Sequence, residues 1–416
     1  MASNKPRGVS ILGSTGSIGC NALDLIERLE GLESGRFRVV ALTAASNADR
    51  LIEQVKRHRP LLACIARESL ARQVRDGVAG TTTRVVAGAE GLLEAATLEE
   101  ADLVLAGIVG AAGLPPTYAA VESGKTVALA NKEALVLAGD LMISAARRSG
   151  ATLLPVDSEH NALHQCLRGE SVDEVRRLVL TASGGPFLRR PELDLSRATP
   201  EEALAHPTWV MGRKISIDSA TLMNKALEVI EARWLYGLPA EKISVIIHPQ
   251  SIIHSMVEFV DGSFVAQLGA TDMRHPIQYA LTWPRRCETP LEPLDLAALK
   301  GMTFQEPDLD RFPCLSFGWR ALRQGGTMPA ALNAANEVAV EAFLAGRIPF
   351  TEIARIIDHV METHRPAEAS SLDVILQADA WARETAAGWA ARSSTPATSA
   401  APVAPVAHDG PKHTGR

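Results

Sequence analysis

The chain is poor in cysteine and aromatic residues, and neither sign of charge dominates it. Of its 416 residues, five are cysteines and 4% are aromatic, and 42 basic and 48 acidic side chains give a formal net charge of −6. The odd cysteine count and the lack of a Cys-x-x-Cys spacing argue against a disulfide framework and a zinc ribbon. They favour a reducing compartment, so we expect a cytoplasmic protein. Because basic residues are not clustered, we expect no nucleic-acid partner.

Long apolar runs are also missing. The longest, about Leu103–Leu114, falls short of the ~20 residues that cross a bilayer, and the next candidate, Thr126–Ala146, contains charged residues. We therefore expect no membrane association. Only Met1–Arg7 precede the first predicted strand, so we expect neither a signal peptide nor a transit peptide.

Up to about residue 156, short apolar runs alternate with amphipathic helical patterns. This alternation predicts an α/β fold with a doubly wound, Rossmann-like parallel sheet, so we assign residues 1–156 to a nucleotide-binding domain. The predicted strands are Val9–Leu12, Phe37–Leu42, Leu61–Ile65, Arg84–Ala87, Leu103–Ile108, Val127–Ala130 and Thr152–Val156.

The remaining sequence predicts three further parts and a tail. Residues 157–282 predict a mixed α/β catalytic domain, 283–313 a proline-rich surface linker, and 314–392 a C-terminal helical bundle. Residues 393–416, rich in Ser, Thr, Ala and Pro, predict a disordered tail. Within the catalytic domain we expect strands near Arg177–Thr181, Ile243–Ile247, Met256–Val260 and Ser263–Leu268, a two-residue hairpin turn at Asp261-Gly262, and one long helix near Ser219–Tyr236.

A glycine-rich turn, Gly13-Ser14-Thr15-Gly16-Ser17-Ile18-Gly19, follows the first predicted strand and opens a helix. Glycines in this context let backbone N–H groups approach a pyrophosphate at a helix N-terminus. The spacing is G-x-x-G-x-x-G, a variant of the usual dinucleotide pattern, and it indicates a nucleotide cofactor. The alternative is a tight strand–helix turn without a ligand.

The end of the second predicted strand bears on which nucleotide is bound. An NAD site calls for an acidic residue about 20 residues beyond the glycine turn, to bind the ribose 2′-hydroxyl. Here the strand leads into Ala45, Ser46 and Asn47, and Asp49 falls inside the following helix. Small polar residues leave room for a 2′-phosphate, with Ser46 and Asn47 as possible donors, so NADP is favoured.

Carboxylates gather at two places. Asp157 and Glu159 follow the last predicted strand of the first sheet, and in an extended segment they would project to the same side. Glu228 shares one face of the predicted long helix with Asn224 and Lys225. Such a carboxylate set without cysteine suits Mg²⁺ or Mn²⁺. Both groups could instead be ordinary solvated surface residues.

Other polar clusters give weaker signals. Asn131, Lys132 and Glu133 end a predicted parallel strand, and a Ser-Gly-Gly loop at Ser183 could cradle phosphate oxygens. The loop 206–214 carries Trp209 and Met211 without helix or strand periodicity, which is typical of a segment that covers a site but also fits local packing. We expect His248 and His254 to be structural.

Together these clusters identify the chain as resembling the 1-deoxy-D-xylulose 5-phosphate reductoisomerase family over about residues 8–390. The matching motifs are Gly-Ser-Thr-Gly-Ser-Ile-Gly at 13–19, Ala-Asn-Lys-Glu at 130–133, Pro-Val-Asp-Ser-Glu-His-Asn at 155–161, Ser-Gly-Gly-Pro-Phe at 183–187, Met-Gly-Arg-Lys-Ile-Ser-Ile-Asp-Ser-Ala-Thr-Leu-Met-Asn-Lys at 211–225 with Glu228, and His-Pro-Gln-Ser-Ile-Ile-His-Ser-Met-Val at 248–257. The resemblance implies an NADPH- and metal-dependent enzyme of the non-mevalonate isoprenoid pathway. It would rearrange 1-deoxy-D-xylulose 5-phosphate and reduce the resulting aldehyde to 2-C-methyl-D-erythritol 4-phosphate.

The resemblance also implies roles for individual residues, with Lys132 and the metal ligands as the catalytic residues. It implies a homodimer and a flexible loop over the substrate at about 203–213. The implied metal ligands are Asp157, Glu159 and Glu228; the implied substrate contacts are Lys132, Ser158, Ser183, His206, Ser219, Asn224 and Lys225; the implied NADPH contacts are Thr15, Gly16, Ser17, Ile18, Asn131, Glu133 and Gly212. To these we add Glu159, Trp209 and Glu228 as substrate contacts and Ala45, Ser46 and Asn47 as NADPH contacts, and we expect Trp209 to be the loop's apolar cover and Gly212 to let it bend.

One departure from the family and two rival functions remain open. Some members have Gly-Lys-Asn where this chain has Ala45-Ser46-Asn47, so Ser46 must replace a lysine contact to the 2′-phosphate or the contact is lost. A metal-free NADP-dependent dehydrogenase would keep the glycine turn without needing the carboxylates. A nucleotide-binding sensor would bind NADPH without turnover.

Overall fold

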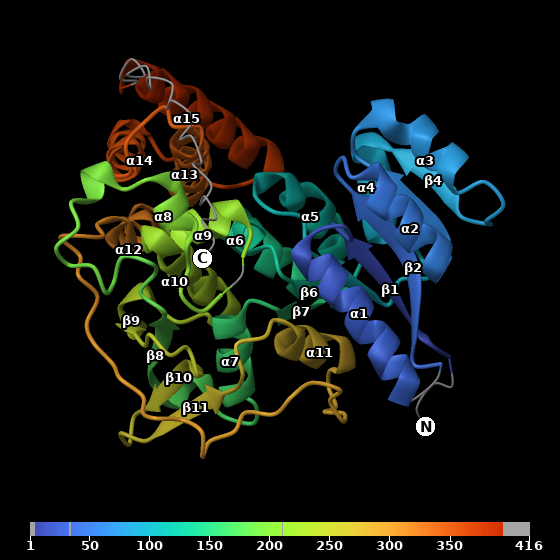
Figure 1. The fold of residues 1–416 in the computed structure, drawn as a ribbon, viewed down its shortest axis with the longest axis horizontal. Coiled ribbons are helices and arrows are strands. Elements are labelled where there is room, and N and C mark those ends of the chain that lie inside the picture. The colour runs from blue at the N-terminus through green and yellow to red at the C-terminus, as the bar shows by residue number, and fades with distance from the viewer. Residues whose placement is uncertain (1–4, 33–34, 210, 394–416) are drawn as a thin grey trace, which may run out of the picture.

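The structure is a computed structural model that describes residues 5–32, 35–209 and 211–393. Its first sheet has seven parallel strands in the order β4-β3-β2-β1-β5-β6-β7 (Figure 1), so the predicted α/β fold is confirmed. Each predicted strand forms within two residues of its expected bounds. The strands are β1 (Arg7–Leu12), β2 (Phe37–Ala44), β3 (Leu62–Ile65), β4 (Arg84–Ala87), β5 (Leu103–Ala106), β6 (Thr126–Leu129) and β7 (Thr152–Pro155).

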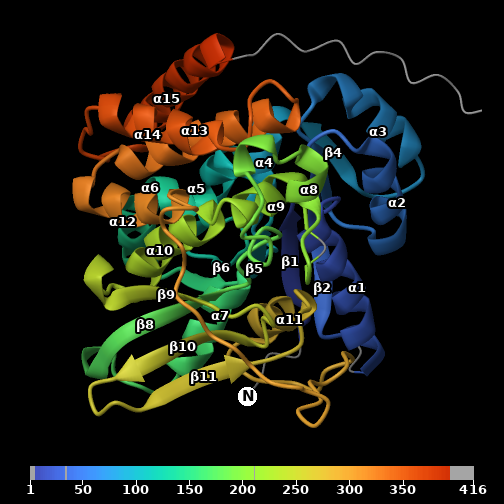
Figure 2. The ribbon, with the colours of Figure 1, turned by 60° about the vertical axis from the view of Figure 1, so that its left-hand side comes forward.

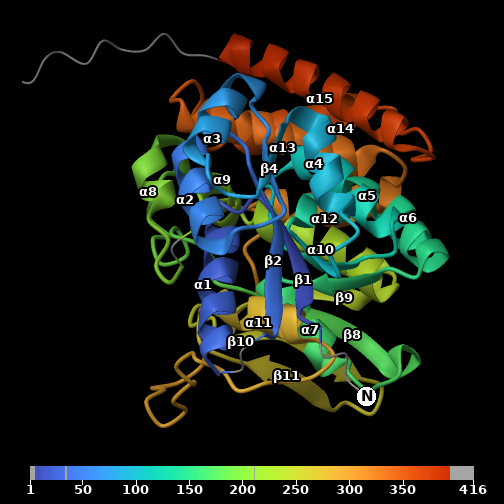
Figure 3. The same cartoon turned by 90° about the vertical axis from the view of Figure 1, so that its right-hand side faces the viewer.

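Helices cover both faces of this sheet, as the doubly wound prediction requires (Figure 3). One face packs apolar side chains such as Ala22, Leu51 and Val74 from α1 (Ser17–Leu32), α2 (Ala48–His58) and α3 (Ala71–Gly77). The other face packs side chains from α4 (Gly88–Thr97), α5 (Leu114–Glu122) and α6 (Lys132–Ser149). From β1 the strands β2 to β4 extend the sheet on one side, and β5 to β7 extend it on the other. The connections before and after this change of side diverge, which leaves a crevice at the carboxyl ends of β1 and β5.

A second sheet of four strands has the order β11-β10-β8-β9 and is mixed: β8 (Val175–Ala182) runs parallel to β9 (Ile243–Ile247) and antiparallel to β10 (Ile253–Phe259). β10 and β11 (Phe264–Leu268) form the predicted hairpin. Its loop is not the expected two-residue turn, because the Phe259 N–H bonds to the Ser263 carbonyl and encloses residues 260–262. Gly262 takes φ +88°, which a three-residue loop with a terminal bulge favours.

The predicted long helix at 219–236 is wrong in its first turn. The structure has two helices, α9 (Arg213–Ala220) and α10 (Met223–Tyr236), separated by Leu222 at φ +59°. A left-handed leucine cannot continue a helix, so α10 leaves in a new direction. Ser219 therefore lies in the last turn of α9, while Asn224, Lys225 and Glu228 lie on α10.

The C-terminal part is helical, as predicted, and forms α12 (Cys314–Gln324), α13 (Met328–Leu344), α14 (Glu352–Thr363) and α15 (Leu372–Ser393). Before it, the described residues 283–313 contain no helix or strand, only an isolated bridge between Ile247 and Gln305. Ser393, expected in the tail, instead ends α15, and its hydroxyl donates to the Glu352 carboxylate. The rest of the predicted tail, residues 394–416, lies outside the described residues.

The remaining helices connect these parts. α7 (Ser158–Cys166) packs against β10 and β11, α8 (Pro200–Leu204) against α9, and α11 (Arg274–Thr282) returns to α1. Figure 2 shows α13, α14 and α15 at one end of the molecule and the hairpin of the second sheet at the other. One apolar core runs from the α6 face of the first sheet through α10 to α13 and α15. No helix among the described residues is long and apolar enough to cross a membrane.

We predict that α12 sets the position of α10 through a close contact at Gly318. A Cβ at this position would lie 2.4 Å from the carbonyl oxygen of Ala226 on α10. Gly318→Ala should therefore lower the free energy of unfolding by about 1–3 kcal/mol, measured by denaturant titration. The matched control is Gly388→Ala on α15, where the nearest atom lies 3.8 Å away, and it should be neutral or stabilising. Equal effects of the two substitutions would contradict this reading.

Candidate active site

The glycine-rich turn has the geometry that the sequence predicts. Gly13 follows β1 at φ +84°, and its N–H donates to the Thr43 hydroxyl at the end of β2, 2.8 Å away. Gly19 packs α1 onto the turn, because a Cβ there would lie 2.4 Å from the Cα of Ser14. The turn thus requires glycine at both positions. It leaves Gly16 and Ser17 at the N-terminus of α1, facing the crevice between β1 and β5.

A cavity of about 470 Å³ runs from this turn to the carboxylates. Most of the predicted site residues line it, although they come from distant parts of the chain. Thr15, Ala45, Ser46, Asn47 and Glu228 are not in its lining: Thr15 belongs to the glycine turn, the next three residues follow β2, and Glu228 is fully buried. Those in the lining are Gly16, Ser17, Ile18, Asn131, Lys132, Glu133, Asp157, Ser158, Glu159, Ser183, His206, Trp209, Gly212, Ser219, Asn224 and Lys225.

The N-terminus of α6 brings three of these residues into the cavity. The Asn131 side chain accepts from the Ala134 N–H and donates to the carbonyl oxygens of Ile108 and Gly110, so it caps α6 and fixes the loop after β5. Lys132 extends toward the carboxylates. Glu133 turns the other way and lies 2.6 Å from the Lys214 ammonium in the first turn of α9.

The carboxylates and two lysines form one buried network around Glu228. The Lys132 ammonium lies 2.9 Å from Asp157 and 3.3 Å from Glu228, and the Lys225 ammonium lies 2.8 Å from Glu159 and 2.5 Å from Glu228. Glu228 is fully buried and joins both lysines. The predicted face of α10 is therefore correct, but it looks into the cavity and is not solvated.

Asp157 and Glu159 do converge, but not by extension of a strand. β7 ends at Pro155, Asp157 is the N-cap of α7, and Glu159 lies in the first turn of that helix. The Asp157 side chain accepts from the Ser158 N–H, and the Ser158 hydroxyl donates to Glu159 over 2.6 Å. The capping preference of aspartate, not the period of a strand, explains this local geometry.

Burial and charge act in opposite directions on these groups. Burial, together with the nearby Glu159 carboxylate, raises the pKa of Glu228 to about 7. Burial alone would raise the pKa of Asp157 and of Glu159, but the adjacent Lys132 and Lys225 ammonium groups outweigh it and lower both. The pKa of Lys132 is raised, because its carboxylate neighbours outweigh its burial. In this network three carboxyl groups contact two ammonium groups.

This donor set fits a divalent cation. Asp157, His160 and Glu228 offer ligand atoms that all lie within 4.8 Å of one another; the predicted ligand Glu159 is not in this group, although it lines the cavity with Asp157. Carboxylate oxygens suit Mg²⁺ and Mn²⁺.

His160 was missed in the sequence. It lies one turn after Asp157 on α7, fully buried, with its Nε2 3.1 Å from the Glu231 carboxylate on α10. The i, i+3 spacing from Asp157 on a helix was the available signal.

Ser183 and His206 meet on the far side of the cavity. The two side chains lie 2.8 Å apart, Oγ to Nε2, and the Trp209 N–H donates to the His206 Nδ1. Because Nδ1 accepts, the neutral ring carries its proton on Nε2 and donates to Ser183; burial lowers the pKa of His206 and favours this neutral form. A Cβ on Gly185 would lie 2.7 Å from the carbonyl oxygen of Ser219, so the Ser-Gly-Gly loop packs against the end of α9.

The loop before α9 partly matches expectation. Trp209 is half-buried, its ring lies 6.3 Å from that of His254, and it lines the cavity without joining the apolar core of the described residues. Gly212 takes φ −63°, which any residue adopts, so its backbone here does not require glycine. Val210 lies outside the described residues.

The two histidines expected to be structural differ. His248 is structural: its ring is buried, bonds to the Thr303 carbonyl and stacks on Phe304. His254 lies in the cavity wall with Met211 and Met273, so its assignment as purely structural was too narrow.

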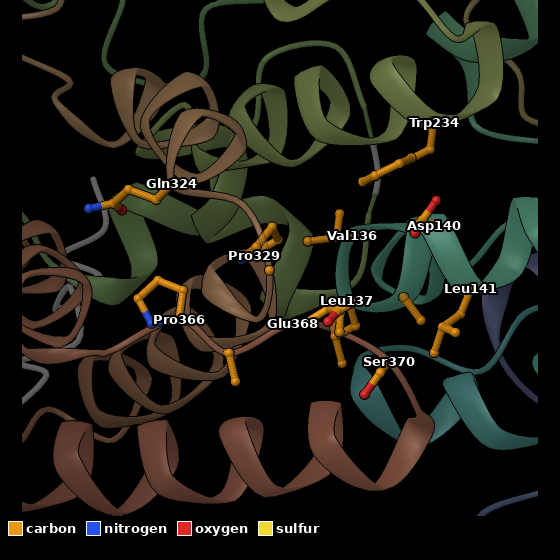
Figure 4. Close-up of a pocket in the computed structure, with 15 residues that line it drawn as sticks. Val136, Leu137, Asp140, Leu141, Trp234, Gln324, Pro329, Pro366, Glu368 and Ser370 are labelled. Carbon is orange, nitrogen blue, oxygen red and sulfur yellow. The ribbon is translucent and has the colours of Figure 1, made fainter.

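A second cavity, of about 430 Å³, is lined by residues of α6 and α10 and by the segment 366–370 (Figure 4). Val136, Leu137 and Asp140 of α6, Trp234 of α10 and Pro329 of α13 are among the residues that line it. It contains none of the predicted site residues.

Comparison with known proteins agrees with this architecture. The family model for 1-deoxy-D-xylulose 5-phosphate reductoisomerase matches residues 9–139, the model for its C-terminal domain matches 153–236, and the DXP reductoisomerase C-terminal domain model matches 268–385. A 1-deoxy-D-xylulose 5-phosphate reductoisomerase from Symbiobacterium thermophilum is 56% identical over 384 residues, which cover 91% of this chain and 98% of that one. One from Geobacter metallireducens is 54% identical, with 90% and 97% covered.

Solved structures of the same family are also similar to this chain. The reductoisomerase from Zymomonas mobilis in complex with NADPH has a TM-score of 0.86 and 49% identity, covering 93% of this chain and 99% of that one. A DOX-P reductoisomerase in complex with NADPH, fosmidomycin and magnesium has a TM-score of 0.87 and 43% identity, covering 92% and 98%. On this evidence the chain belongs to the 1-deoxy-D-xylulose 5-phosphate reductoisomerase family.

Proposed function

We propose that this protein converts 1-deoxy-D-xylulose 5-phosphate to 2-C-methyl-D-erythritol 4-phosphate with NADPH and a divalent cation, Mg²⁺ or Mn²⁺, in isoprenoid precursor biosynthesis. The observation that carries the proposal is the joining of two sites in one cavity. The glycine turn at Gly16 and Ser17 opens into the same space as Lys132, Asp157 and Glu159. A nucleotide at the turn and a sugar phosphate at the carboxylates would therefore lie next to each other, as hydride transfer requires.

Asp157, Glu159 and Glu228 would hold the cation. When bound, it would stabilise the negative charge that develops on the carbonyl and hydroxyl oxygens as the carbon–carbon bond moves. Lys132 touches both Asp157 and Glu228, so its ammonium is held beside the reacting oxygens and adds positive charge there. Burial of these groups strengthens each interaction because little water screens them.

We assign the other predicted contacts from their places in the cavity. Ser183, Ser219, Asn224 and Lys225, with Ser158 and His206 beside them, would bind the substrate and its terminal phosphate, and this remote binding energy would orient the reacting end. NADPH would contact Thr15, Gly16, Ser17 and Ile18 at the turn, Ala45, Ser46 and Asn47 at the end of β2, and Asn131, Glu133 and Gly212 nearer the substrate.

Three broader assignments complete the proposal. Residues 1–156 would form the cofactor domain, 157–282 the catalytic domain, 283–313 a linker and 314–392 a helical domain. The protein would act in the cytoplasm. It would be a homodimer, and the edge strand β11 offers a surface for this, because Phe264, Val265 and Leu268 are exposed on it.

The first prediction tests the metal site. Glu228→Gln should lower turnover by at least about 100-fold while NADPH still binds, because the cation loses a buried ligand. The assay follows NADPH oxidation with 1-deoxy-D-xylulose 5-phosphate, with and without Mg²⁺ or Mn²⁺, and Glu241→Gln at an exposed position is the control. Full activity after exhaustive chelation would favour a metal-free dehydrogenase, and NADPH binding without turnover would favour a sensor.

The second prediction concerns the loop over the cavity. Trp209→Ala should raise the KM for the sugar phosphate roughly tenfold or more, because an apolar cover is lost. It should move the melting temperature by no more than about 2 °C, because the Trp209 side chain, unlike that of Trp319, does not pack against the apolar core of the described residues. Trp319→Ala is the contrasting variant, since its indole packs against the core and donates to the Ile243 carbonyl, so it should lower the melting temperature strongly. A similar drop for Trp209→Ala with normal kinetics would rule out the loop's role.

The third prediction tests the homodimer. The double substitution Phe264→Glu and Leu268→Glu should shift the mass measured by light scattering from dimer to monomer, because it places charge on the β11 edge. Leu376→Glu, at an exposed apolar residue of α15, is the control and should remain a dimer. A monomeric wild-type protein would contradict the assignment.

A further inference from the structure

Two arginines flank the segment that follows β2. Arg50, the third residue of α2, places its Nη1 3.5 Å from the carbonyl oxygen of Thr15 in the glycine turn. Arg67 follows β3, and its backbone N–H donates to the carbonyl oxygen of Ala45 over 3.0 Å. One cation therefore reaches the turn from the helix after β2, and another is tied by its backbone to the segment itself.

The acidic groups in this region are turned to other partners. Asp49 accepts from the Gln73 side chain, 2.8 Å away, and the Glu68 carboxylate lies over Gly88, where a Cβ would come within 2.6 Å of it. Across residues 5–32, 35–209 and 211–393, no carboxylate lies within 4.0 Å of the Arg50 or Arg67 guanidinium. Both side chains are exposed and carry positive charge without a counter-ion among the described residues.

The segment between them offers no charge of its own. Ala45 has no polar side chain, Ser46 offers a neutral hydroxyl, and Asn47 uses its carbonyl oxygen to cap α2 at the Arg50 N–H. NADPH differs from NADH only by a phosphate on the adenosine ribose. A guanidinium meets such a phosphate with two parallel N–H donors and is always charged.

We propose that Arg50, with Arg67 beside it, binds the 2′-phosphate of the cofactor and sets the preference for NADPH over NADH. This inference rests on the proposed function, because it takes NADPH as the cofactor of the cavity. It assigns the cofactor preference to a helix residue next to the glycine turn and to the start of the segment after β3. Ser46 is then a secondary neutral donor.

The test measures binding of cofactor fragments by calorimetry, without turnover. The two probes are adenosine 2′,5′-bisphosphate and AMP, which differ only in the 2′-phosphate. Arg50→Gln should weaken binding of the bisphosphate by about 10- to 100-fold and leave AMP unchanged, because a charge-assisted contact is lost. Arg67→Gln should have a smaller effect in the same direction, and Arg50→Lys should keep part of the affinity. Arg72→Gln, whose side chain is 91% exposed on α3, is the charge-matched control and should bind as wild type does.

The outcomes separate this inference from the function on which it rests. If wild type binds the bisphosphate more tightly than AMP, and the variant with both Arg50→Gln and Arg67→Gln keeps that difference, the arginine assignment is overturned and the function stands. If wild type does not distinguish the two probes, the assignment is overturned together with the choice of NADPH. AMP affinity equal to that of wild type confirms that each variant is folded at the turn.

Discussion

The site depends on one carboxylate, Glu228, that is buried between two lysines. Its side chain has no exposure to solvent, and burial together with Glu159 raises its pKa to about 7, while Lys132, Lys225 and the Asn224 amide all contact it. Each of these lysines also binds a second carboxylate, Asp157 or Glu159. Buried charges that share partners fix one another's positions, and removing any one leaves another uncompensated. The charged side chains therefore hold one another in position around the proposed cation site.

The fold forms this network by bringing three separate elements to one point. β6 ends where α6 presents Lys132, β7 ends where α7 presents Asp157 and Glu159, and α10 packs against α6 and presents Glu228. α10 takes this direction because the left-handed backbone of Leu222 separates it from α9. Gly318 then lets α12 approach α10 closely. Parallel strands place their carboxyl ends on one edge, so the cofactor turn after β1 shares that edge with the carboxylates.

Much of this was accessible from the sequence, for physical reasons that differ by element. The inner strands of the first sheet, such as β1, β3 and β5, are buried on both faces, so their apolar runs were clear in the sequence. The glycine turn keeps its spacing because Gly13 and Gly19 have no room for a side chain. The polar face of α10 was also correct. Its environment was not, since the helical period gives a direction but not whether solvent or protein lies there.

The predictions that were wrong or incomplete failed for separate physical reasons. A left-handed residue such as Leu222 leaves no mark in the period of apolar residues, so α9 and α10 appeared as one helix. Asp157 was expected in an extended segment because β7 precedes it, whereas its carboxylate caps α7. His160 and Lys214 escaped notice because their roles depend on long-range partners, Glu231 for one and Glu133 for the other. Pairs between residues far apart in the chain cannot be recognised from residue spacing in a single sequence.

The long-range character of the network also bears on how the protein acquires its site during folding. The bonds from Lys132 to Glu228 and from Lys225 to Glu159 close chain segments of 96 and 66 residues. Within the glycine turn, by contrast, the bond from Gly13 to Thr43 joins residues only 30 apart. Because distant closures form more slowly than near ones, this bond should form before the carboxylate network. The crevice beside the turn also needs β5, whose Leu103 pairs with Val9 of β1, so a nascent chain would shape the turn first and complete the nucleotide crevice and the cation site later.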